Sequence, residues 1–121
     1  MVKVLQTPQE VNRVSNFFVV GNGQALACSG TSANVAFQSL PQNVQYATDI
    51  LLYNAGTVNV FVAFGSDNTI TASAPTNGTP ANGIIIAPSA YLAFNKGYAT
   101  YIAGIAASST ATLYFYQGYG S

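Results

Sequence analysis

Three acids, three cations and one cysteine are all that this 121-residue chain offers for acid–base, nucleophilic or metal chemistry. The acids are Glu10, Asp49 and Asp67, and histidine is absent. Nucleophilic catalysis of the Ser–His or Cys–His kind needs an adjacent base that this composition does not contain. A glycosidase needs two facing carboxylates, and the three acids are far apart in the sequence. The residues therefore predict a protein that is not an enzyme.

The sequence also lacks the groups of residues that usually bind a metal or a cofactor. Cys28 is the only cysteine, so it forms no intrachain disulfide, and zinc would lack its usual ligands. We expect Cys28 to act as a small buried hydrophobe. The segment Asp67-Asn68-Thr69 offers oxygen ligands for calcium, but with one carboxylate a solvated turn is the favoured interpretation. We predict no metal site and no cofactor.

The chain carries very little charge. Only 5 % of its residues are charged, whereas ordinary domains carry about a quarter. Its cations, Lys3, Arg13 and Lys96, form no basic patch, so we expect neither nucleic acid nor a membrane surface as a partner. Eight Tyr and seven Phe in so neutral a chain indicate a surface used against another protein. The alternative is a surface kept soluble by Ser, Thr, Asn and Gln alone.

Residues 1–16 differ from the rest, hold half of the charged residues, and are predicted to form an N-terminal arm. Thr7-Pro8-Gln9-Glu10 fits the start of a helix, with Thr7 as cap, so one or two helical turns are expected near residues 8–14. An extended arm is the alternative. The start of the chain lacks the apolar stretch of a secretory signal, which with the single cysteine favours assembly in a reducing cytoplasm.

Residues 17–121 are predicted to form one all-β domain of about eight short strands. The strongest pattern is DILLYNAGTVNVFVAFG, residues 49–65, where two apolar runs flank Asn-Ala-Gly and predict a central hairpin. Similar hairpins are expected across residues 29–32 and 107–109. The inward-facing positions of the second run should be Val58, Val60, Val62 and Phe64.

Residues 66–83 form the one long connection and are rich in Pro, Gly and small polar residues. We expect an exposed and comparatively mobile loop, with Ile70 as its apolar anchor. The spacing of the strands leaves no room for crossover helices, which excludes a parallel α/β sheet. The predicted fold is an antiparallel β-sandwich of jelly-roll type, with an immunoglobulin-like sandwich as the alternative.

The last clear strand pattern supplies candidate partner-binding residues. Alternation over residues 110–116 puts Leu113 and Phe115 on one face and two tyrosines on the other, about 7 Å apart. If Tyr101 on the preceding strand lies beside them, the outer face becomes an aromatic patch. Rings that merely cover the rim of the core are the alternative. The predicted partner-binding residues are Tyr101, Tyr114, Tyr116, Phe61 and Tyr91.

Two stretches, ILLYNAGTVNVFVAFG and YIAGIAASSTATLYFYQGYG, together resemble small tailed-bacteriophage virion proteins of about this length. The chain departs from that pattern at Tyr119, where an acidic residue is often found, and in the long polar loop before Ile84. The resemblance implies a jelly-roll cement or decoration protein on the capsid exterior. Its implied partners are the major capsid protein and copies of itself, as a dimer or trimer. A small tail or spike protein that contacts a host-surface glycan is the alternative.

Overall fold

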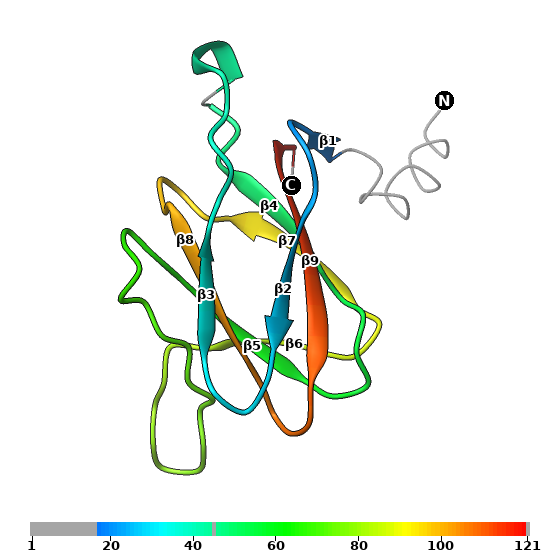
Figure 1. Ribbon diagram of the computed structural model, residues 1–121, viewed down its shortest axis with the longest axis vertical. Helices are drawn as coiled ribbons and strands as arrows, with labels where there is room; N and C mark the ends of the chain where they lie inside the picture. The colour runs from blue at the N-terminus through cyan, green and yellow to red at the C-terminus, as the bar shows by residue number, and fades with distance from the viewer. Residues whose placement is uncertain (1–16, 45, 121) are drawn as a thin grey trace, which may run out of the picture.

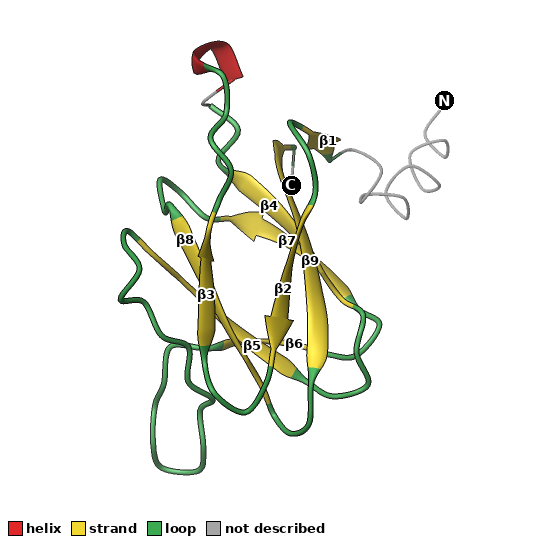
Figure 2. Cartoon of the chain, viewed as in Figure 1, coloured by secondary structure: helices red, strands yellow, loops and turns green. Residues whose placement is uncertain are grey.

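The computed structural model describes residues 17–44 and 46–120, and nearly all of its regular structure is β-strand (Figures 1 and 2). Its strands form two packed antiparallel sheets of five and four strands. The only helix of the described residues is a single 3₁₀ turn, η3 (Gln42–Val44), on the way from the third strand to the fourth. The predicted arm over residues 1–16 lies outside the described residues.

Sheet A contains the first and last strands of the domain. Its central strand, β9 (Ala111–Tyr119), pairs along one side with β1 (Phe18–Val19) and then β2 (Gln24–Cys28), and along the other side with β4 (Asp49–Asn54). The outer edge is β7 (Tyr91–Asn95), which pairs with β4.

Sheet B lies against sheet A and has the order β3-β8-β5-β6. Its strands are β3 (Ala33–Ala36), β8 (Tyr101–Ala106), β5 (Val60–Gly65) and β6 (Ile84–Ile86). With β1 and β2 counted as one interrupted edge strand, the two sheets have the strand order of a jelly roll. The predicted antiparallel sandwich is therefore confirmed, including its jelly-roll arrangement.

The three predicted hairpins are wrong, because each of these short connections crosses from one sheet to the other. β2 and β3 lie in different sheets, as do β4 and β5, and β8 and β9 (Figure 1). Alternation tells which face of a strand is buried but not which strand lies beside it. Two strands that face each other across the core show the same pattern as two strands that pair.

Asn54 stabilises the crossing from β4 to β5 through its side-chain amide and is fully buried. Its Nδ2 donates to the carbonyls of Val58 (2.8 Å) and Ile86 (2.9 Å), and its Oδ1 accepts from the Gly56 N–H (2.9 Å). A Cβ on Gly56 would collide with the Ala111 Cβ. Asn and Gly are thus needed here for hydrogen bonding and close approach, not for a tight hairpin turn.

The main core lies between the two sheets. Val60 and Val62 are fully buried, and Val58 and Phe64 pack against the same cluster, so the predicted inward face of β5 is confirmed. Cys28 is also buried there, and burial raises the pKa of its thiol to about 11. That environment suits a small hydrophobe and disfavours the reactive thiolate.

A second, smaller cluster lies on the outer face of sheet B, beneath the loop of residues 66–83. Ala72 of the loop packs with Ala63 and Ala103 of the sheet, and Ile70 lies against them as its predicted anchor. The Ala72 N–H donates to the Ser32 hydroxyl at 2.8 Å. The first half of the loop is therefore fixed to the sheet. Its outer part, which forms an exposed turn near residues 76–79, extends away from the sandwich (Figure 1).

Candidate binding face and end pocket

The outer face of sheet A carries three tyrosines in register across three neighbouring strands. Tyr53 of β4 lies opposite Tyr91 of β7 on one side and opposite Tyr114 of β9 on the other. The ring centroids of Tyr53 and Tyr91 are 4.5 Å apart. Tyr91 is 57 % exposed and Tyr114 is 41 % exposed. We call Tyr91, Tyr53 and Tyr114 the tyrosine row.

Tyr116 lies next to the tyrosine row but is less exposed. It pairs with Leu51 of β4, in the neighbouring row of the same face. Its ring lies over Gly23, where a Cβ would collide with the ring atom Cε2. Glycine just before β2 therefore makes room for the ring. Tyr116 extends the apolar face toward the β2 edge and also shields that edge from solvent.

The tyrosine row is electrically neutral. Among the described strands of sheet A, Asp49 at the start of β4 is the one charged residue. Its Oδ1 accepts a hydrogen bond from the Asn95 Nδ2 at 2.9 Å. A partner could therefore cover the row without removing a charge from water, which is the costly step in burying a polar surface.

Two of the predicted partner-binding residues are not part of this face. Tyr101 and Phe61 lie on sheet B, so the expectation that Tyr101 lies beside Tyr114 is wrong. The reason is the crossing between β8 and β9, which the sequence pattern predicts to be a hairpin. Phe61 lies near the end of the 66–83 loop, where a Cβ on Gly83 would be 2.7 Å from its own.

Tyr53 is absent from the predicted set because the sequence pattern assigns its strand to the central core hairpin. In β4 the buried positions alternate, with Ile50, Leu52 and Asn54 inward. That alternation places Tyr53 outward. Because one of the buried positions is the polar residue Asn54, the sequence does not show a regular alternation of apolar and polar residues in this strand.

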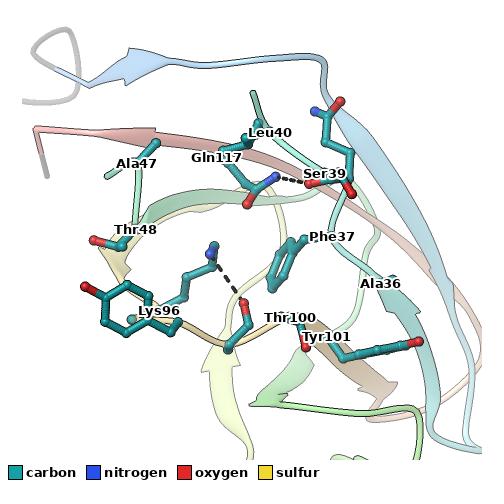
Figure 3. A pocket seen from close by; sticks show the side chains of 14 residues that line it. Ala36, Phe37, Ser39, Leu40, Ala47, Thr48, Lys96, Thr100, Tyr101 and Gln117 are labelled. Atoms are coloured by element: carbon teal, nitrogen blue, oxygen red, sulfur yellow. Dashed lines mark hydrogen bonds between the residues drawn. The ribbon is translucent and has the colours of Figure 1, made fainter. Parts of the chain in front are cut away.

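A pocket of about 400 Å³ opens at the end of the sandwich where β3 and β7 finish and β4 and β8 begin (Figure 3). We call it the end pocket. Polar and aromatic side chains meet there. Gln117 comes from β9, and connections between the strands supply Phe37, Thr48, Lys96, Tyr98 and Thr100. Tyr101, predicted for the aromatic face, also lines this pocket.

Lys96 is the only cation among the described residues, and Figure 3 shows its side chain in the same space as Phe37 and Gln117. Its Nζ lies 4.8 Å from the centroid of the Phe37 ring and donates to the Ala99 carbonyl at 3.4 Å. Burial lowers its pKa. Gln117 is almost fully buried, and its Nε2 donates to the Gln38 carbonyl at 3.1 Å.

Comparison with known proteins gives no family for the chain. No family model matches it, and no curated protein matches it. One solved chain, described by the words "Bacillus endospore appendages form a novel family of disulfide-linked pili", is 16 % identical, with a TM-score of 0.42. The match covers 86 % of this chain and 89 % of the pilus chain. Similarity at this level carries no argument about what the chain binds.

Neither a membrane-spanning helix nor a metal cluster is found in the described part of the chain. None of its helices is long and apolar enough to span a membrane. Within the same residues, no three His, Cys, Asp or Glu side chains gather in a way that could hold a metal ion. The tyrosine row presents exposed aromatic rings, and the end pocket brings a cation together with hydroxyl groups.

Proposed function

We propose that this chain is a non-enzymatic structural protein of a tailed-phage virion, a cement or decoration protein that binds the outside of the capsid. The observation that carries the proposal is the tyrosine row, exposed on the outer face of sheet A, whereas the outer face of sheet B is partly covered by the 66–83 loop. The row would dock on the major capsid protein or on a second copy of the chain.

Tyrosines suit such an interface for physical reasons. Each ring buries a large apolar area, its hydroxyl pairs with polar groups of the partner, and few rotatable bonds are frozen on binding. Three rings fixed in register on a sheet are already arranged before the partner arrives, which lowers the entropic cost of association. Neutral surroundings add no charge to be desolvated.

The low charge of the whole chain supports a place in a repeating shell. With a formal net charge of zero, many copies can lie close together without accumulating repulsion. The sequence resemblance to small tailed-phage virion proteins points in the same direction. In this proposal the protein acts on the capsid exterior, as a dimer or trimer that clamps neighbouring capsid subunits.

The test is a double variant, Tyr91→Ser with Tyr114→Ser, added to capsids purified without the protein. We expect circular dichroism to show an intact fold and capsid binding to fall by roughly tenfold or more, because exposed aromatic anchors dominate interfaces of this kind. Tyr98→Ser is the matched control, since Tyr98 is 90 % exposed and lies at the end pocket. Folded double variant with full capsid binding would contradict the proposal.

A second candidate is a tail or spike module that contacts a host-surface glycan. The observation in its favour is the end pocket, which combines hydroxyl groups, a cation and the exposed ring of Tyr98. The number of copies per virion separates the two candidates. Many copies spread over the head support decoration, and a few copies at the tail support the glycan-binding module.

A further inference from the structure

We propose that the end pocket binds the ring of an acidic sugar, with Lys96 as the residue that recognises the sugar carboxylate. The site is separate from the tyrosine row, because none of the three tyrosines lines it. Gln117 shares β9 with Tyr114, but it is almost fully buried, whereas Tyr114 is exposed. The proposed sugar site therefore does not depend on whether the protein decorates a phage head or belongs to a tail.

The cation in the pocket is placed to receive an anion. The Lys96 ammonium has three N–H donors, and its hydrogen bond to Ala99 is long, at 3.4 Å. The Phe37 ring, 4.8 Å away, supports a positive charge but does not neutralise it. The pKa of Lys96 is lowered by burial, whereas a neighbouring carboxylate would raise it. A ligand carboxylate would therefore relieve the cost of holding this charge at a partly buried position.

Two threonine hydroxyl groups line the pocket: one accepts a hydrogen bond within the protein, and the other donates one. The Thr48 Oγ1 accepts from the Asn95 Nδ2 at 3.1 Å, so its own proton remains available to a ligand. The Thr100 Oγ1 donates to the Ser66 carbonyl at 3.0 Å, so its lone pairs remain available. Sugar hydroxyls both donate and accept, and this pair of threonines matches them. An acidic peptide side chain would use the cation but would leave the two hydroxyl groups unmatched.

Size and shape favour a single ring. A volume of about 400 Å³ is near the lower end of ligand pockets, which span roughly 300–1,000 Å³. Tyr98 lines the pocket and is 90 % exposed as a residue, so its ring can stack on the apolar side of a sugar. One acidic ring, at the end or along the length of a glycan, meets these conditions.

The experiment titrates the full chain with glucuronic acid, glucose and acetate, followed by the NMR shifts of the Lys96 and Thr100 amides. Glucuronic acid and glucose share a ring and differ in the carboxylate, and acetate has the carboxylate without the ring. We expect glucuronic acid to bind roughly tenfold more tightly than either. Equal binding of glucuronic acid and glucose, equal binding of acetate, or no binding would overturn the proposal.

Variants assign the site to named residues. Lys96→Gln and Lys96→Met should each reduce glucuronic acid binding by roughly tenfold, and Tyr98→Ser should reduce it by severalfold. Tyr91→Ser, on the tyrosine row, should leave it unchanged. A short Glu-containing peptide that binds more tightly than the sugar acid would also overturn the proposal. Capsid binding by the same Lys96 variants should be normal, so failure of this site and failure of the capsid proposal can be told apart.

Discussion

The chain covers part of the outer face of sheet B with its own loop but leaves the outer face of sheet A exposed. On sheet B, the outward positions beneath the loop are the small residues Ala63 and Ala103, and Ala72 of the loop packs onto them. On sheet A, the corresponding outward positions of three adjacent strands are tyrosines, and two of these remain substantially exposed. One face is partly buried by the chain itself, and the other presents its aromatic rings to solvent.

The difference shows what the size of an outward-facing residue implies in a sandwich. Small side chains let a loop approach the strands closely, so Gly65 can lie against Ile70 and Ala63 can be buried by the loop. Large rings keep a loop at a distance but offer area to a partner. At Ala63 and Ala103, small outward side chains let the chain cover its own sheet, whereas the outward tyrosines of sheet A leave rings exposed to a partner.

The largest difference between the two faces is expected when the same substitution is made on each. Ala103→Asp would bury an unpaired carboxylate under the loop, and we expect it to lower the free energy of unfolding by about 3 kcal/mol or more. Ala25→Asp is the matched control, because Ala25 is exposed on the outer face of sheet A beside Tyr114. It should cost no more than about 0.5 kcal/mol. Urea unfolding measures both, and equal losses would contradict the comparison.

A smaller effect is expected from the anchor of the loop. Ile70→Ala removes partly buried apolar contacts, and we expect a loss of about 1–2 kcal/mol, together with faster hydrogen exchange of the Ala72 amide. Ile85→Ala is the control, because Ile85 is 52 % exposed on the same sheet and should cost less. If the Ala72 amide exchanged at the same rate in the variant and the wild type, the loop would not be held by Ile70.

The smallest effect on stability at neutral pH is expected from Cys28, a residue of β2 that is buried in the core between the two sheets. Its pKa is about 11 in the folded state against an ordinary value of 9.0, so the folded thiol keeps its proton longer than the unfolded one. This contribution to stability is fully present below about pH 9 and is lost as pH rises toward about 11. Cys28→Ala should show a weaker loss over that interval in thermal melts. A native thiol that reacts with a labelling reagent at pH 8 as fast as the unfolded chain would contradict the burial.

The sequence was sufficient for the fold class and insufficient for strand pairing. Alternation and turn residues predicted the strands and their inward faces, as Val60 and Val62 show. The hairpin predictions were wrong because a short polar turn can join two paired strands or two strands of different sheets. What decides at residues 54–56 is the buried amide of Asn54, whose partners at Val58 and Ile86 are known only from the three-dimensional structure.

The candidate site could be predicted only in part, for the same reason. The structure places Tyr91, Tyr114 and Tyr116 on the outer face of one sheet, as expected. It places Tyr101 and Phe61 on the other sheet and adds Tyr53. The end pocket had no sequence signal, because its residues come from segments up to 81 positions apart, from Ala36 to Gln117, and none forms a motif.

The central claim, that the tyrosine row is the docking face, is tested most directly by hydroxyl-radical footprinting of free and capsid-bound protein. Mass spectrometry then gives the oxidation of each tyrosine. We predict that oxidation of Tyr91 and Tyr114 falls severalfold on the capsid, because the partner excludes solvent from the centre of an interface. Tyr98 at the end pocket should be oxidised as in the free protein. Unchanged oxidation of Tyr91 and Tyr114, with protection of Tyr98 instead, would contradict the claim.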